Sequence, residues 1–153
     1  MKPIRNSAKA IIIKDGKLLA IEKADLNGPW YLLPGGGQHP GETLHQALAR
    51  ECKEEANAAV RIGELRFIRE YIGRNHEFAA EDAETHQIEF MFACGLVNPG
   101  EIGAGHEPDE GQLNVVWLDL EHLLRYRLYP LSLRDQLKNP ANTGFPVYLG
   151  DVN

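Results

Sequence analysis

Cysteine is scarce in this chain, with two residues, Cys52 and Cys94, among 153. Their spacing matches no arrangement of metal-binding cysteines, which excludes a zinc site built on several thiolates. A disulfide framework is not expected either, because a chain of this length buries enough surface to fold without crosslinks. Both thiols are therefore expected to be reduced and buried.

An excess of positive charge is also missing. The chain carries 16 Lys and Arg against 22 Asp and Glu, for a formal net charge of −6. Nonspecific binding to nucleic acid or to an anionic membrane calls for a basic patch, so neither partner is expected. A polyphosphate substrate remains compatible with this charge if metal ions and a few local cations offset the repulsion.

Long hydrophobic runs are absent as well. No segment approaches the roughly 20 apolar residues of a membrane span, and the N-terminal MKPIRNSAKA lacks the apolar core of a signal peptide. No internal repeat or linker divides the chain. The sequence therefore predicts one domain over residues 1–153 in a cytoplasmic protein.

Two β-rich runs, residues 7–13 and 18–23, flank Asp15-Gly16, which predicts a β-hairpin. The continuous apolar run at residues 11–13 favours a strand that is covered on both faces. Further strands are expected at residues 30–33, 59–72, 85–97, 113–120 and 145–149, and short helices at 119–124 and 132–137. Strands mixed with helices on both faces indicate an α/β fold.

Some positions in these segments leave alternatives open. Leu113 is a candidate for an inward position, and Glu89, on an otherwise apolar strand, is either a buried functional carboxylate or a residue on a solvated face. Lys23 and Arg74 are weak candidates for substrate contacts, and exposed surface positions are favoured for both. The segment 145–149 could add an edge strand or contact a second copy of the chain, which leaves a homodimer open.

Residues 43–56 are expected to form a helix. Thr43 followed by Gln46 resembles a capping box. The apolar residues recur at steps of three and four and should face the core, with the glutamates on a different face: Leu44, Ala47, Leu48, Cys52 and Ala56.

Three glutamates of this helix, Glu51, Glu54 and Glu55, are spaced so that they share one face. Like charges so placed repel, and a divalent cation such as Mg²⁺ would convert that repulsion into coordination. Arg50, four residues before Glu54, could orient the carboxylates. A solvated helix face is the alternative for this run alone, because such charge patterns are common on protein surfaces.

The wider spacing from residue 36 to 58, GGQHPGETLHQALARECKEEANA, resembles the Nudix box, the signature of the Nudix hydrolase family. Gly36 meets the opening glycine of that pattern, and Glu42, Arg50-Glu51 and Glu54-Glu55 meet every charged position. Cys52 and Ala58 stand where larger aliphatic residues are usual, and Asn57 stands in place of glycine. Cysteine packs as a small hydrophobe and asparagine accepts the left-handed conformation that ends a helix, so these departures are structurally tolerable.

The resemblance implies an α/β/α sandwich with a mixed β-sheet and a hydrolase that cleaves a phosphoanhydride bond in a nucleoside diphosphate linked to another group. It implies Mg²⁺, with Mn²⁺ as an alternative, held by Glu51, Glu54, Glu55 and the carbonyl of Gly35. Glu42 and Arg50 would orient these ligands. A Gly-rich turn alone is a weak signal, but residues 35–37 run directly into the carboxylate helix.

The base that activates water is less defined by the resemblance. Glu54 is favoured, and Glu110 or Glu107 in the acidic loop before the Trp-containing strand are alternatives. A catalytically silent nucleotide-binding regulatory module and an isomerase-like or sugar-transfer relative are the other two functions considered. Intact box carboxylates count against the silent module. The choice of nucleotide does not follow from the sequence.

Overall fold

The computed structural model describes residues 2–139 and 144–153 and forms a mixed sheet with helices on both faces. Its strands are β1 Arg5–Lys14, β2 Lys17–Asp25, β3 Gly28–Leu32, β4 Gly35–Gly37, β5 Val60–Ile72, β6 His86–Leu96, β7 Asn114–Asp119 and β8 Tyr148–Asp151. The strand order is β3-β2-β1-β6-β5-β8, with β4 paired to β1 and β7 paired to β2. The β1–β6 and β5–β8 pairs are parallel and the remaining pairs antiparallel.

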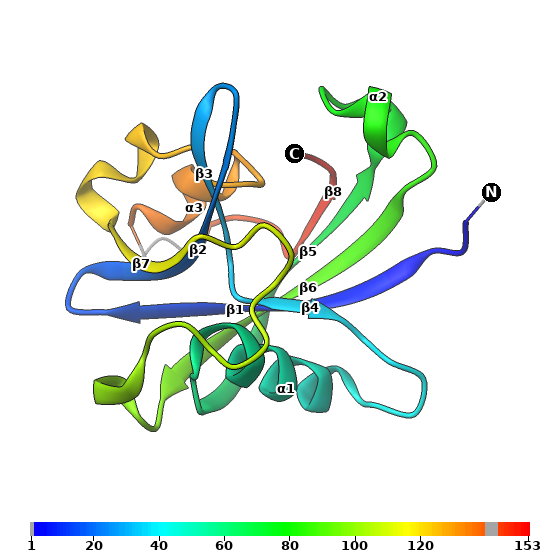
Figure 1. The fold of residues 1–153 in the computed structure, drawn as a ribbon. Helices are drawn as coiled ribbons and strands as arrows, with labels where there is room; N and C mark the ends of the chain where they lie inside the picture. Colours follow the sequence, from blue (N-terminus) through cyan, green and yellow to red (C-terminus); the bar gives the residue numbers. More distant parts are fainter. Residues whose placement is uncertain (1, 140–143) are drawn as a thin grey trace.

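The helices are α1 Leu44–Ala56, α2 Ala79–Asp82 and α3 Leu133–Leu137, with 3₁₀ turns η1 Gly73–Asn75, η2 Pro99–Glu101 and η3 Leu120–Arg125. Figure 1 shows α1 on one side of β1 and α3 on the other. The expected α/β/α sandwich is thereby confirmed. The segment expected to be helical after residue 119 is a 3₁₀ helix. Among the described residues, none of the helices has the length and apolar character needed to span a membrane.

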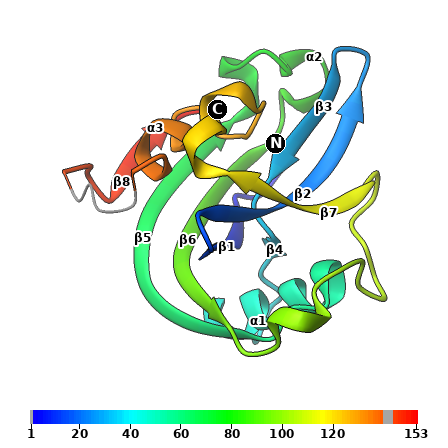
Figure 2. The same cartoon turned by 90° about the vertical axis from the view of Figure 1, so that its left-hand side faces the viewer.

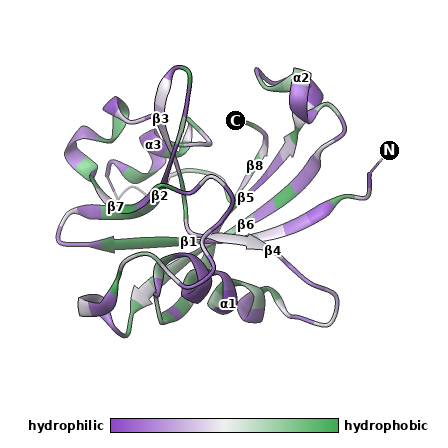
Figure 3. Ribbon diagram, in the orientation of Figure 1, coloured by the Kyte–Doolittle hydropathy of each residue, from purple (hydrophilic) through white to green (hydrophobic). Residues whose placement is uncertain are grey.

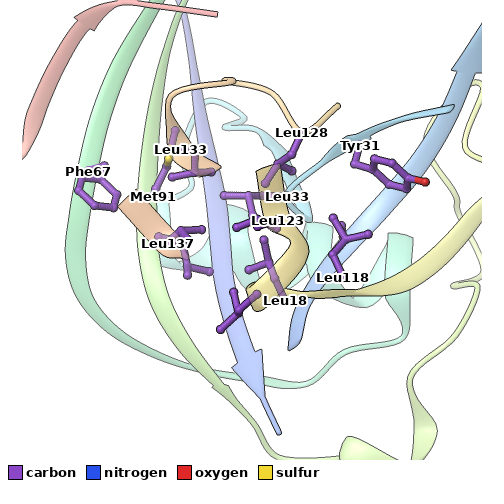
Figure 4. Close-up of a cluster of buried hydrophobic side chains, with 13 residues drawn as sticks. Leu18, Tyr31, Leu33, Phe67, Met91, Leu118, Leu123, Leu128, Leu133 and Leu137 are labelled. Atoms are coloured by element: carbon purple, nitrogen blue, oxygen red, sulfur yellow. The ribbon is translucent and has the colours of Figure 1, made fainter. Parts of the chain in front are cut away.

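Strand β1 contributes side chains to two hydrophobic clusters on opposite faces of the sheet. Ile11 packs in a cluster with residues of η3 and α3, whereas Ala10 and Ile12 pack in a cluster with α1. Figure 4 shows the first cluster and Figure 3 shows the hydrophobic character along β1. The prediction that residues 11–13 form a strand covered on both faces is confirmed for Ile11 and Ile12.

The hairpin between β1 and β2 is confirmed. Asp15 has φ 51° and Gly16 has φ 73°, so both central residues of the turn adopt the left-handed conformation. This conformation is the one that a two-residue hairpin turn matching the twist of the strands requires.

Strand β5 is long and curved, as expected for residues 59–72. Its register against β6 shifts between Ile62 and Leu65 and again between Leu65 and Phe67. Such bulges bend a strand, and Figure 2 shows β5 and β6 curving together. At the edge of the sheet β8 pairs with β5, which supports the edge-strand interpretation, although the strand covers Tyr148–Asp151 and not residues 145–149.

The expected inward position of Leu113 was wrong: it is 58% exposed, because it precedes β7 at the edge of the sheet. Of the two positions left open for Glu89, the solvated one is excluded by its exposure of 4%. The three glycines at residues 35–37, interpreted from the sequence as a turn, form the short strand β4.

Both ends of α1 carry the caps that the sequence indicates. The Thr43 hydroxyl accepts a hydrogen bond from the Gln46 amide at 3.1 Å, and the Gln46 side chain accepts one from the Thr43 amide at 2.8 Å. Asn57 ends the helix with φ 51°. Four of the apolar residues predicted to face the core are buried, and Leu44 is partly buried.

Replacing Thr43 with alanine removes the acceptor for one free amide of the first turn of α1. We expect the free energy of unfolding to fall by about 1 kcal/mol. Urea unfolding followed by circular dichroism measures this change. Thr43→Ser keeps the hydroxyl and serves as the control, and an equal loss in both variants would contradict the capping role.

Candidate active site

The glycine strand β4 lies directly against α1. Gly35 has φ +133°, and a Cβ atom there would lie 2.1 Å from the carbonyl oxygen of Ala8. A Cβ atom on Gly36 would lie 2.6 Å from the carboxyl carbon of Glu51. The backbone of β4 therefore approaches the carboxylates of the helix as closely as only glycine permits.

Glu55 is buried, with 3% of its surface exposed. The Gly35 amide donates a hydrogen bond to Oε1 of Glu55 at 2.8 Å. Burial raises the pKa of Glu55 to about 7, although the charge of Lys9 and the hydrogen bond from Gly35 act in the opposite direction. A solvated helix face is therefore excluded for Glu55, and a buried carboxylate with such a pKa marks a candidate functional position.

Lys9 is a component of this site that sequence reasoning missed. Its ammonium donates a hydrogen bond to the carbonyl oxygen of Gly35 at 3.1 Å and contacts that of Leu33 at 3.5 Å. The available signal was a lysine between Ala8 and Ala10 in the central strand. The Gly35 carbonyl, predicted to hold a metal ion, thus already faces a positive charge.

Arg50 joins the carboxylates to β4. Its guanidinium bonds both oxygens of Glu42 at 2.8 and 2.9 Å, Glu51 at 3.0 Å, Glu54 at 3.3 Å and the carbonyl of Gly37 at 3.0 Å. The hydrogen bonds from Arg50, with that from the His39 amide, lower the pKa of Glu42 to about 2. This geometry agrees with an orienting role for Glu42 and Arg50.

Of the predicted metal ligands, Glu51 lies beside Gly36 and Glu55 meets the Gly35 amide, whereas Glu54 contacts Arg50. Among residues 2–139 and 144–153, no three His, Cys, Asp or Glu side chains are already arranged to hold a metal ion. Glu51 and Glu54 instead face Arg50, and Glu55 faces the Gly35 amide. Carboxylate and carbonyl oxygens are nevertheless the donors that Mg²⁺ prefers, so the residues fit such an ion. Gly35, Glu51, Glu54 and Glu55 remain predicted ligands.

A cavity of about 290 Å³, the first cavity, opens beside these residues, and Gly35, Gly36 and Glu51 form part of its wall. Four aromatic residues line it as well: Trp30, Tyr71, Phe78 and Tyr129. The ring of Tyr129 makes edge contacts with Trp30 at 5.8 Å and with Phe78 at 5.7 Å between centroids. The sequence did not predict that these residues come together, because they lie in distant segments of the chain.

Arg69 and Glu89 form a buried ion pair at the wall of the first cavity, with 2.6 Å between Nε and Oε2. Gln87 donates a second hydrogen bond to Glu89 at 2.8 Å. Burial opposes ionisation of Glu89, but the charges of Arg69 and Lys9 and these hydrogen bonds leave its pKa below the ordinary value. Glu89 is thus a buried, paired carboxylate, and its partner Arg69 was not expected from the sequence.

The acidic loop between η2 and β7 is attached to the C-terminal end of α1. The amides of Gly105 and Glu107 donate hydrogen bonds to the carbonyls of Glu55 and Glu54, each at 3.1 Å. Asp109 lines the first cavity, whereas Glu107 and Glu110 are exposed and lie outside its wall. The role of Glu110 as a base remains a prediction.

The two candidate substrate contacts lie in different settings. Lys23 binds Asp109 at 2.7 Å and lies over the ring of Trp30 at 5.7 Å, so it reaches the rim of the first cavity. Arg74 is exposed in η1 and is not among the residues that line this cavity. Both remain predictions, and the position of Lys23 is the more favourable one.

The structure is an α/β/α sandwich in which the glycines of β4 pack against the glutamates of α1. This is the arrangement that the resemblance to the Nudix box predicts. Residues 3–137 match the model of the NUDIX domain, and the chain belongs to this family.

Two curated relatives and one solved structure are similar to the chain. An ADP-ribose pyrophosphatase of Methanocaldococcus jannaschii is 31% identical over 116 residues, which cover 74% of the chain and 60% of the relative. A MutT-like protein of Streptomyces ambofaciens is 45% identical over 58 residues, 38% of the chain and 36% of that protein. The chain thus spans less than two thirds of either relative. A NUDIX hydrolase from Nitrosomonas europaea has the same fold, with a TM-score of 0.69, 20% identity and coverage of 95% and 94%.

Replacing Arg69 with methionine leaves Glu89 buried without its charged partner. We expect a loss of about 3 kcal/mol or more in the free energy of unfolding, measured by urea unfolding at pH 7. The double variant Arg69→Met with Glu89→Leu should lose less of the free energy of unfolding, because it leaves no unpaired charge buried.

The same pair should contribute to the pH dependence of stability. The pKa of Glu89 is lowered in the folded protein, so the contribution is complete above the ordinary value of 4.5 and is lost as the pH falls through the folded value. An equal acid sensitivity in the wild type and the double variant would contradict this assignment.

Proposed function

We propose that this chain is a Mg²⁺-dependent nucleotide pyrophosphohydrolase that cleaves a phosphoanhydride bond in a nucleoside diphosphate linked to another group. The observation that carries the proposal is the buried Glu55, held by the Gly35 amide beside Glu51 and next to a cavity with aromatic walls. The fit of these donors to Mg²⁺, or to Mn²⁺ in its place, supports the choice of cofactor.

Each residue of the box has a proposed role. Glu51, Glu54, Glu55 and the Gly35 carbonyl hold the cation, while Arg50 and Glu42 fix the orientation of these carboxylates. When bound, Mg²⁺ supplies positive charge to phosphate oxygens and lowers the pKa of water. Binding also requires Lys9 to leave or share the Gly35 carbonyl, since two cations compete for that oxygen.

Glu54 is the proposed base that removes a proton from the attacking water, and Glu110 is the alternative. Glu54 lies on the same helix as the other carboxylates and contacts Arg50 at 3.3 Å. Asp109 is nearer to the first cavity than Glu110, but its carboxylate already binds Lys23. The ion pair makes Asp109 less suited to accept a proton.

The first cavity is the proposed site of the nucleobase. Trp30, Phe78 and Tyr129 present ring surface on which a base can stack, and base–aromatic stacking tolerates different bases. Lys23 at its rim would meet phosphate. The relative named ADP-ribose pyrophosphatase makes ADP-ribose the first compound to test. We further propose that the protein is cytoplasmic and binds neither nucleic acid nor membranes. Both a monomer and a homodimer remain possible.

A catalytically silent nucleotide-binding module is the second candidate. The pairing of Arg50 with Glu51 and Glu54 favours it in one respect, since those oxygens are already occupied by hydrogen bonds. Against it, nothing in a regulatory role requires a third carboxylate to be buried at Glu55. A panel of nucleotides with Mg²⁺ distinguishes these functions. Release of nucleoside monophosphate is expected only from the hydrolase, and not from a silent module or an isomerase-like enzyme.

Glu55→Gln tests the site most directly. We expect turnover of the best substrate to fall at least about 100-fold, because one of the carboxylates proposed to hold the cation loses its charge. The fold should survive, since the glutamine oxygen can still accept the hydrogen bond from Gly35. Product release by chromatography and the thermal midpoint are the two measurements.

Glu64→Gln is the matched control for this variant, because the Glu64 side chain is 79% exposed on β5. It should leave both turnover and the thermal midpoint unchanged. Near-normal turnover of Glu55→Gln would rule out the assignment of Glu55.

Removal of divalent cations tests the cofactor. We expect EDTA to abolish turnover and added Mg²⁺ to restore it, with Mn²⁺ restoring it in part or in full, because the donors are oxygens. The assay follows product formation at several concentrations of each cation. Full activity after exhaustive chelation would contradict the proposed dependence on metal.

A further inference from the structure

Residues 73–85 connect β5 to β6 and supply part of the wall of the first cavity. Three of them line the cavity: Phe78, Asp82 and Thr85. The segment contains η1 and α2, and of its residues only Gly73 is buried. A helix of four residues is not stable by itself, so the positions of Phe78 and Asp82 must be fixed by contacts with other elements.

Asp151, the last residue of β8, contacts the turn at which this segment begins. Its Oδ1 accepts a hydrogen bond from the Ile72 amide at 2.9 Å and lies 2.6 Å from Nε2 of His76. Its Oδ2 accepts one from the Asn75 side chain at 2.7 Å. Burial opposes ionisation of Asp151, but these hydrogen bonds leave its pKa below the ordinary value. The carboxylate is therefore charged at neutral pH, and both of its oxygens hold the turn.

A second set of contacts leads from this turn to α2. The ring of His76 stacks on that of Tyr71, with 5.4 Å between centroids and 12° between planes. The hydroxyl of Tyr71 donates a hydrogen bond to Oδ2 of Asp82 at 3.0 Å. Tyr71 and Asp82 both line the first cavity. A continuous path of contacts thus joins the carboxylate of Asp151 to the cavity wall.

The two ends of the segment are also joined to each other. The Gly73 amide donates a hydrogen bond to the carbonyl of Thr85 at 2.9 Å. A Cβ atom on Gly73 would lie 2.0 Å from the carbonyl oxygen of Asp82, so the backbone packs closely there. Because these ends are in contact, a displacement of the turn at residues 73–76 also displaces Asp82.

The attachment of β8 to the sheet does not depend on the Asp151 side chain. The Val152 amide donates a hydrogen bond to the carbonyl of Glu70 at 3.2 Å. The guanidinium of Arg69 donates another to the carbonyl of Val152 at 2.6 Å. Removing the Asp151 side chain should therefore release residues 73–85 and leave the strand in place.

We propose that Asp151 is a positioning residue for nucleotide binding, because it holds residues 73–85 so that Phe78 and Asp82 complete the wall of the first cavity. The inference rests on the proposed function in taking this cavity as the nucleotide site, and goes beyond it by assigning a role to the edge strand. The described hydrogen bonds of the Asp151 side chain go to residues 72–76, and none reaches a proposed ligand of the cation. Asp151 should therefore affect affinity and not the reaction step, since a wall that is already ordered lowers the cost of binding.

Binding of AMP, GMP, CMP and UMP, measured by calorimetry with Mg²⁺, tests this role. Nucleoside monophosphates contain no phosphoanhydride bond, so the proposed reaction does not consume them. We expect the wild type to bind at least one of them and Asp151→Ala to weaken that binding about 10-fold. Asp151→Asn keeps an acceptor for the Ile72 amide and should weaken it less. Amide hydrogen exchange in Asp151→Ala should become faster at residues 73–85 and stay unchanged at residues 60–70.

The kinetic test uses a substrate that the wild type hydrolyses. Asp151→Ala should raise KM about 10-fold and change kcat less than about 2-fold. His76→Phe keeps a ring on Tyr71 but removes the contact with Asp151, so it should also raise KM. The double variant should be no worse than Asp151→Ala alone, because both changes break the same contact.

Tyr148→Phe is the matched control. It removes a hydrogen bond from the same strand to Glu70 without changing a contact of residues 73–85. Binding of the monophosphates and KM should both stay at the wild-type values.

Unchanged affinity, KM or hydrogen exchange in Asp151→Ala would overturn the inference, as would a fall in kcat at unchanged KM or an equal loss in Tyr148→Phe. A wild type that binds none of the four monophosphates would overturn it as well. If the variants show the expected binding pattern but no compound of the nucleotide panel is hydrolysed, the proposed function fails while the positioning role of Asp151 stands.

Discussion

The contact between β4 and α1 is the constraint on which the site depends. The Gly35 amide meets the carboxylate of the buried Glu55, and Gly35 can take this position only because a side chain there would collide with the backbone of β1 at Ala8. Gly36 likewise leaves room for the carboxylate of Glu51. Burying a carboxylate costs free energy unless hydrogen bonds or charges compensate. The glycines and the buried acid therefore depend on each other. Arg50 extends the same contact by joining the helix to the carbonyl of Gly37.

Charge compensation organises the neighbouring groups as well. Lys9 lies close enough to influence both Glu55 and Glu89, and Arg69 balances Glu89 within the sheet. Through Gln87 this network reaches Arg5, whose charge has no carboxylate partner among the described ion pairs. A protein with an acidic overall charge thus presents a local cation beside its carboxylates, which is the combination that an anionic ligand with a bound metal requires.

The sequence predicted the features that arise from local chemistry. Asp15-Gly16 predicted the hairpin, and Thr43 with Gln46 predicted the start of α1. The apolar run through Ile12 predicted the strand that is covered on both faces. It did not predict Lys9, the Arg69–Glu89 pair or the aromatic wall of the first cavity. These depend on contacts between strands and loops far apart in the chain, and no periodicity records such contacts. Burial of Glu55 was likewise hidden, because helical spacing gives the direction of a side chain but not the element packed against it.

The two-sided packing of β1 has a consequence for how the molecule opens. Because its alternate side chains belong to clusters on opposite faces, neither cluster can lose its packing without exposing the strand to which the other is attached. Amide protons in the middle of β1 should therefore exchange with solvent only through global unfolding. Strand β4 is hydrogen-bonded to β1, so its paired amide protons should share this protection.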